Sequence, residues 1–157
     1  MKSAFTLVYI LLFSLVSLAP MNAQAKPGTW AVVKGWTITG DSGDQSCYAA
    51  TRYDDNVDMM VLFDNDRVHW IIGNIIVVPE KVYTVNVVAS NGSAGTMSAV
   101  GLKDGKAVAF LDLNKVAVVA IAEARSIQIQ GLGRYNLYGS KAAIMETWEC
   151  YKTMNSF

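Results

Sequence analysis

The chain has 157 residues with 13 basic and 13 acidic side chains, which gives no formal net charge at pH 7. This balance provides no basic surface for a phosphate backbone, so we expect no nucleic-acid partner. The length suits one domain with a hydrophobic core of its own.

The first 25 residues have the pattern of a secretory leader. Lys2 supplies a positive start, residues 4–19 form an almost unbroken apolar run, and residues 23–25 are the small-x-small triplet Ala-Gln-Ala. The alternative is an uncleaved membrane anchor, because the run approaches the minimum length that spans a bilayer. The polar residues after the run and the lack of a following basic cluster favour cleavage. We therefore predict a signal peptide over 1–25 and a single mature domain over 26–157, with no membrane span after cleavage.

Cys47 and Cys150 are the two cysteines of the chain, and both lie in the predicted mature domain. In an oxidising compartment they are expected to pair and to close a loop of about 100 residues. A catalytic thiol would need an activating base, and the single histidine, His69, has no sequence-level reason to meet either cysteine. The pair is therefore interpreted as structural.

Short runs rich in Val, Ile, Tyr and Thr alternate with turn clusters, a pattern typical of antiparallel sheet. The expected strands are 47–53, 57–63, 68–72, 82–89, 96–102, 107–111, 126–130 and 134–138. Residues 30–39 form either a strand pair or one strand bent around Gly35. Within 57–63 and 82–89 the apolar residues alternate, which predicts half-buried strands.

Two pairs, Asn-Gly at 91–92 and Asp-Gly at 104–105, predict tight hairpin turns because both accept positive φ angles. The first pair is followed by Ser93 and so also fits the glycosylation acceptor pattern. The hairpin explains the same residues on backbone grounds, so we favour the turn.

Residues 113–124 leave the two-residue rhythm and place apolar side chains at helical spacing, with Asp112 as the expected N-cap. Val118 and Val119 leave a strand as the alternative. This segment is expected to be a helix that packs on the sheet.

A second helix is expected to start with Ser140 as its cap, with Ile144, Trp148 and Tyr151 along one face. A bond from Cys150 to the first cysteine would tie this helix to an early strand. The fold class is therefore α+β: an antiparallel sheet or sandwich of about seven to nine strands with one or two helices.

The segment around the first cysteine, Ser-Cys-Tyr-Ala-Ala at 46–50, and the closing Leu-Tyr-Gly-Ser-Lys-Ala-Ala at 137–143 resemble a group of small exported bacterial proteins without a characterised function. Size and leader are also distantly similar to the invasion-associated locus B family of exported bacterial proteins, although the glycine-cysteine pair of that family is absent. The resemblance implies a periplasmic or secreted β-rich domain and transfers no catalytic residue.

Two acidic segments are candidates for metal sites. Residues 54–58 have the opening spacing of a calcium loop, but Met59 stands where glycine is required and Asn65 where a glutamate is required. Asp64 and Asp66 form a turn that Asx hydrogen bonds explain without an ion. We therefore expect no metal and no cofactor.

The leading functional hypothesis is an exported, non-enzymatic binding or envelope-associated protein whose partner is a protein or a cell-wall glycan. Its candidate binding surface is aromatic and comprises Trp36, Tyr53, Trp70 and Tyr135, with core packing as the alternative role.

Two other hypotheses stay open at the level of sequence. The first is a small secreted hydrolase that uses His69 as a general base with Asp64 or Asp66, although no established catalytic motif occurs in the chain. The second is an inhibitor of a secreted hydrolase that inserts a loop, such as 54–56 or 90–95, into its target.

Overall fold

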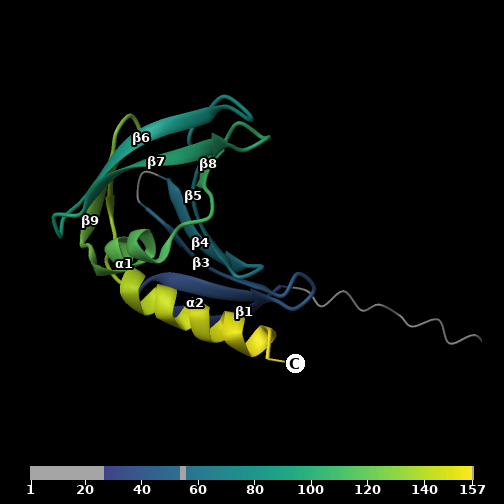
Figure 1. Ribbon diagram of the computed structural model, residues 1–157. Helices are drawn as coiled ribbons and strands as arrows, with labels where there is room; N and C mark the ends of the chain where they lie inside the picture. The colour runs from purple at the N-terminus through teal and green to yellow at the C-terminus, as the bar shows by residue number, and fades with distance from the viewer. Residues whose placement is uncertain (1–26, 54–55, 157) are drawn as a thin grey trace, which may run out of the picture.

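A computed structural model describes residues 27–53 and 56–156. Within them, ten strands form one antiparallel sheet in the order β1-β2-β3-β4-β5-β8-β7-β6-β9-β10 (Figure 1). The strands are β1 (Gly28–Val33), β2 (Trp36–Asp41), β3 (Ser46–Arg52), β4 (Asp58–Asp64), β5 (Arg67–Gly73), β6 (Val82–Ala89), β7 (Ala94–Gly101), β8 (Ala107–Phe110), β9 (Ser126–Ile129) and β10 (Gly133–Asn136). The helices are α1 (Lys115–Glu123) and α2 (Ser140–Met154). The α+β prediction is confirmed, and the strand number reaches ten because residues 30–39 hold a strand pair.

The predicted signal peptide over 1–25 lies outside the described residues, as do the first residues of the calcium-like segment, 54–55. In the part of the chain that the structure describes, no helix is long and apolar enough to cross a bilayer.

In β2, β4 and β6 the buried side chains alternate with more exposed ones and so lie on one face of the curved sheet, whereas all four residues of β8 are buried. Helix α2 lies along the lower edge of the sheet in Figure 1, and α1 lies near the beginning of α2. In β4 the buried residues are Met59, Val61 and Phe63, and in β6 they are Val85, Val87 and Ala89, so the predicted alternation is confirmed in both strands. Because alternate side chains share one face of a strand, these patterns direct a single apolar surface toward the helices.

The sheet curls far enough for the end of β10 to approach β2 and β3. The Tyr53 hydroxyl donates a hydrogen bond to the carbonyl of Asn136, and the indole N–H of Trp36 donates to the carbonyl of Tyr138 at 3.0 Å. The rings of Tyr53 and Tyr135 lie 6.1 Å apart. These contacts join the two ends of the sheet without strand pairing, and the result is an incomplete barrel.

Helix α2 packs on β1 to β4, and the predicted disulfide joins Cys150 of this helix to Cys47 of β3. The prediction that Ser140 caps this helix is wrong. Ser140 is the first residue inside the helix, and its buried hydroxyl donates to the carbonyl of Ile121 at 3.3 Å. Gly139 occupies the cap position with φ +82°, and a Cβ there would lie 2.7 Å from the Cβ of Lys34. The helix therefore begins where the chain turns closely past the β1–β2 connection.

Trp148 was expected on the buried face of α2 but lies at its edge. Its side chain is 44% exposed and stacks on Tyr151 with ring centroids 5.8 Å apart, at the edge of the helix–sheet interface. The buried face consists instead of Ala143, Ile144, Thr147, Cys150 and Tyr151.

Residues 113–124 contain the predicted helix, over Lys115–Glu123, but its cap is Asn114 and not Asp112. The Asn114 side-chain oxygen accepts the N–H of Ala117 at 2.9 Å, three residues into the helix as capping requires. The strand alternative that Val118 and Val119 left open does not occur: Val118 packs partly buried against the core and Val119 is 44% exposed, both within the helix. Asp112 lies two residues before the cap and has φ +52° in the preceding connection.

Both predicted hairpin turns are confirmed. Between β6 and β7 the N–H of Ser93 donates to the Asn91 side chain at 3.0 Å, and between β7 and β8 the N–H of Lys106 donates to the Asp104 side chain at 3.0 Å. These local bonds explain why Asn and Asp precede the glycines.

Candidate ligand cavity between α1 and β7

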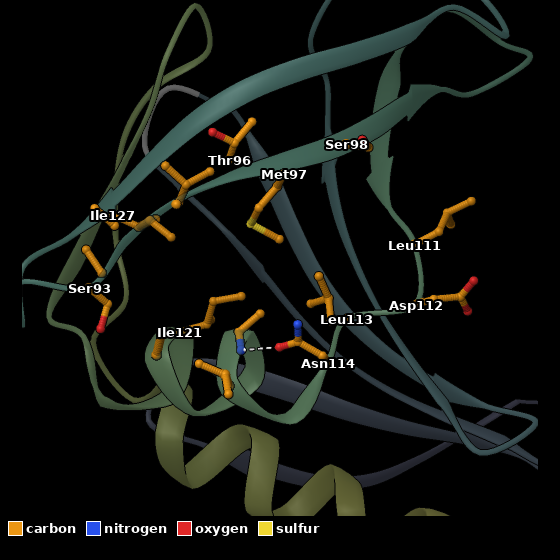
Figure 2. Close-up of a pocket in the computed structure, with 17 residues that line it drawn as sticks. Ser93, Thr96, Met97, Ser98, Leu111, Asp112, Leu113, Asn114, Ile121 and Ile127 are labelled. Atoms are coloured by element: carbon orange, nitrogen blue, oxygen red, sulfur yellow. Dashed lines mark hydrogen bonds between the residues drawn. The ribbon is translucent and has the colours of Figure 1, made fainter.

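A cavity of about 390 Å³ lies between α1 and the inner face of β6 and β7 (Figure 2). It exists because the two helices cover the sheet unequally. Helix α2 packs directly on four strands, whereas the main packing partner of α1 is α2 and not a strand. Part of the inner face near β7 is therefore left without a helix against it.

The wall of this cavity is mainly apolar. The apolar lining residues are Val87, Ala89, Ala94, Met97, Leu111, Leu113, Val116, Ala117, Ala120, Ile121 and Ile127. In Figure 2, Met97 extends from β7 into the space and Leu113 and Ile121 approach it from the other side. Small-molecule sites have this composition and begin at about 300 Å³.

The mouth of the cavity is mixed in polarity. Leu111 is 51% exposed and Val116 is 78% exposed, and both belong to its lining. The polar lining residues at the surface are Ser93, Thr96, Ser98, Asp112 and Asn114. Covering the exposed apolar side chains with a ligand is favourable because it removes them from water.

Asp112 is the one charged side chain in the lining. It is exposed, and one of its carboxylate oxygens lies 3.6 Å from the guanidinium of Arg67. The lining also contains Asn114, whose side-chain oxygen already accepts the N–H of Ala117 as the cap of α1 (dashed line in Figure 2). The lining thus contains no cation that would compensate the charge of a buried carboxylate or phosphate.

His69 positions the connection that leads into α1. The N–H of Asp112 donates to Nδ1 of His69 at 3.2 Å, and the N–H of Leu113 donates to the carbonyl of Val68 at 2.8 Å. The other ring nitrogen, Nε2, lies 2.9 Å from a carboxylate oxygen of Asp64. Because Nδ1 accepts a backbone N–H, the ring proton is on Nε2 and is donated to the carboxylate.

The hydrolase hypothesis named the correct partner for His69 among its two alternatives, but both ring nitrogens are engaged within the protein. Asp66 is held elsewhere, since the hydroxyl of Tyr151 accepts its N–H at 2.7 Å and donates to its carboxylate at 3.0 Å. Burial raises the pKa of Tyr151, so this hydroxyl stays protonated as a donor. The arrangement around His69 serves to hold the chain in position.

Three of the four aromatic residues expected at a binding surface belong to the core, which corrects that prediction. Trp36, Trp70 and Tyr135 are buried because they lie on the inward side of their strands, and Tyr53 is half-buried beside Tyr135. The ring of Trp70 stacks on that of Phe110 at 5.1 Å. Core packing, the alternative role, therefore describes these residues.

Asp58, the last residue of the calcium-like spacing, forms an ion pair with Arg52 at 2.6 Å and accepts a hydrogen bond from the side chain of Asn74 at 2.8 Å. The hydrogen bond from Arg52 lowers the pKa of this carboxyl. Among the residues described, no three His, Cys, Asp or Glu side chains converge as a metal site would require.

Sequence reasoning missed the cavity. The helical spacing in residues 113–124 places Val116 on the apolar face of the helix, whereas in the structure this residue is 78% exposed and lines the cavity. The space itself depends on where α1 rests, and no local pattern encodes that.

No protein-family model matches the sequence, and no curated protein sequence matches it. Among solved structures, the fold is similar to that of invasion associated protein B from Bartonella henselae, with a TM-score of 0.54 and 17% sequence identity. The similarity covers 78% of this chain and 97% of that chain. At this identity the likeness concerns the fold alone. The predicted distant similarity to the invasion-associated locus B family is thus confirmed as a shared fold.

Proposed function

We propose that this protein is an exported, non-enzymatic binding protein that holds a small, uncharged and largely apolar ligand in the α1–β7 cavity. The observation that carries the proposal is the space of about 390 Å³, whose wall is mainly apolar and whose lining contains no cation. This cavity replaces the aromatic surface as the candidate binding site, because most of those aromatic residues belong to the core.

Export is supported by the pairing of Cys47 with Cys150 and by the leader pattern over 1–25. Structural disulfides persist in oxidising compartments such as the periplasm or the extracellular space. The site itself is compatible with either location.

Binding without catalysis is favoured over hydrolysis by the state of His69. A general base needs a free lone pair within reach of its substrate, and here Nδ1 accepts the N–H of Asp112 while Nε2 donates to Asp64. The ring is also buried and does not belong to the lining of the cavity.

The inhibitor alternative required a loop that inserts into a target, and one candidate was 90–95. In this fold Asn91 is tied to α1, because its side-chain amide donates to the carbonyl of Ala120 at 3.2 Å. Residues 93–95 also line the cavity. This hairpin therefore suits a cavity wall better than an inserting loop.

A matched pair of fluorescent probes tests the proposal. Phenylnaphthylamine is neutral and apolar, and anilinonaphthalene sulfonate has the same aromatic framework with an added anionic group. With the purified disulfide-bonded protein we expect saturable binding of the neutral probe and at least about tenfold weaker binding of the anionic one, because the lining offers no cation. Equal affinity for both probes would contradict the proposed ligand class.

Two variants of α1 locate the site. Ala117 lines the cavity, so Ala117→Leu fills it and is expected to weaken the neutral probe by at least about tenfold. Val119 does not belong to the lining, so Val119→Leu introduces the same side chain on the same helix and should leave binding unchanged. If both variants bind like the wild type while circular dichroism shows an intact fold, the cavity is not the site.

A further inference from the structure

The segment that joins β5 to β6 exposes apolar side chains to an unusual degree. Ile76 is 100% exposed, Val78 is 57% exposed, and Val82 at the start of β6 is 64% exposed. A single exposed apolar residue is ordinary on a protein surface, but a cluster of them marks an interaction site. Residues 74–82 are called the apolar tip below.

The apolar tip is held rigidly against the hairpin that joins β7 and β8. The N–H groups of Ile75, Val77 and Glu80 donate to the carbonyls of Lys106, Gly105 and Gly101 at 3.1, 3.0 and 2.8 Å. In Figure 1 the two connections lie together at the arrowhead end of β7. The exposure of the apolar side chains is therefore built into the backbone arrangement.

Two further contacts fix the tip. The Tyr83 hydroxyl accepts the N–H of Val78 at 2.8 Å. Gly101 passes so close to the tip that a Cβ at this position would collide with the carbonyl oxygen of Val78. A surface that is rigid before it binds loses little conformational entropy on binding.

Three lysines and two acidic residues lie at the tip. Lys81, Lys103 and Lys106 are exposed, and within the described residues none of the three forms an ion pair. The Lys81 ammonium lies over the ring of Tyr83, 5.3 Å from its centroid. The acidic residues are Glu80 and Asp104, and the Asp104 carboxylate accepts the N–H of Lys106. An anionic partner therefore has no ion pair of these lysines to displace.

We propose that the apolar tip, together with Lys81, Lys103 and Lys106, docks this protein onto an anionic lipid bilayer. A few exposed aliphatic side chains can enter the boundary between head groups and acyl chains, while lysines extend to the anionic head groups around them. Three lysines against the two carboxylates of Glu80 and Asp104 leave one net positive charge at the tip, which favours an anionic surface over an uncharged one. The inference goes beyond the proposed ligand cavity and does not depend on it.

A vesicle flotation experiment with the purified disulfide-bonded protein tests the docking. Vesicles of phosphatidylcholine with roughly 30 mol% phosphatidylglycerol provide the anionic surface, and vesicles of phosphatidylcholine alone provide the comparison. We expect at least about tenfold more protein on the anionic vesicles at about 0.1 M salt, and a clear loss at about 0.5 M salt because the ions screen the lysines. Failure to bind the anionic vesicles would overturn the proposal.

The double variant Ile76→Ser with Val78→Ser removes the apolar part of the tip without adding charge, and we expect it to bind anionic vesicles at least about tenfold more weakly. Val32→Ser is the control at a distant position, since Val32 is a 69% exposed apolar residue on β1. Thermal unfolding of each variant verifies the fold. Equal vesicle binding by the double variant and the wild type would refute the role of the tip.

A photo-reactive residue in place of Ile76 distinguishes lipid from protein occupants. Crosslinking to phosphatidylglycerol on vesicles is the expected result. Crosslinking to a second copy of the chain or to an envelope protein, without vesicle binding, would show a protein interface instead and would overturn the proposal.

Discussion

The inner face of the sheet is filled in two different ways. Over β1 to β4 it is covered by α2, a helix of 15 residues that is tied to β3 by the disulfide. Over β6 and β7 it meets α1, a helix of nine residues that leans on α2 and leaves a cavity of about 390 Å³. At a rise of about 1.5 Å per residue, α2 is long enough to cross four neighbouring strands, whereas α1 is shorter and covers less of the sheet. One sheet thus forms a closely packed core on one side and the wall of an open cavity on the other.

The largest expected effect concerns the α2 side. Replacing both Cys47 and Cys150 with Ala removes a crosslink across 103 residues, and we expect the free energy of unfolding to fall by about 2–5 kcal/mol. Urea denaturation of this variant and of the reduced wild type measures the loss. A loss below about 1 kcal/mol would mean that α2 is held by packing alone and that the disulfide does not make the α2 side more stable than the α1 side.

A pair of matched substitutions compares the packing of the two sides directly. Ala143 of α2 is fully buried, so Ala143→Leu should overpack the interface and cost about 1–3 kcal/mol. Ala117 of α1 faces the cavity, so Ala117→Leu should change the free energy of unfolding by less than about 0.5 kcal/mol. Similar losses in the two variants, measured by urea denaturation, would show that the α1 side has no usable space.

A smaller effect is expected at the beginning of α1. Asn114→Ala removes the acceptor for the N–H of Ala117 and should cost about 1 kcal/mol. Asn114→Asp retains an acceptor and should restore most of the stability. Thermal unfolding together with binding of the neutral probe would sharpen the comparison, because a loosened α1 also alters one wall of the cavity. Identical stability of the Ala and Asp variants would argue against a capping role.

The smallest expected effect is the pH dependence of the Arg52–Asp58 pair, which lies on the solvent-exposed ends of β3 and β4. The hydrogen bond from Arg52 lowers the pKa of Asp58 in the folded state, so the carboxylate stabilises the fold at neutral pH. That contribution is lost as the pH falls through the lowered folded-state pKa. Asp58→Asn lacks it at every pH, so the difference in unfolding free energy between wild type and variant should shrink on acidification.

Solvent screening keeps this difference small, since the Arg52 and Asp58 side chains are 65% and 37% exposed. Urea denaturation at neutral and strongly acidic pH provides the measurement. A difference that grows toward low pH would contradict the assigned direction.

Much of the fold follows from local patterns in the sequence. The alternation in 57–63 and 82–89, the Asn-Gly and Asp-Gly turns and the position of the C-terminal helix all depend on residues close together in the chain. Asn114 shows the limit of this reasoning, because Asp112 and Asn114 are both good caps and only the geometry of the preceding connection selects the second.

By itself, the sequence determined the strand-rich α+β class, both helices and the pairing of Cys47 with Cys150, since side-chain periodicity and cysteine number are local or countable properties. The tertiary structure decided that Trp36 and Trp70 are core residues, that His69 holds the entry to α1, and that a cavity remains beside β7. These features depend on how far the sheet curls and on which element each helix rests. Curvature and helix placement result from many contacts distant in sequence, so no short segment specifies them.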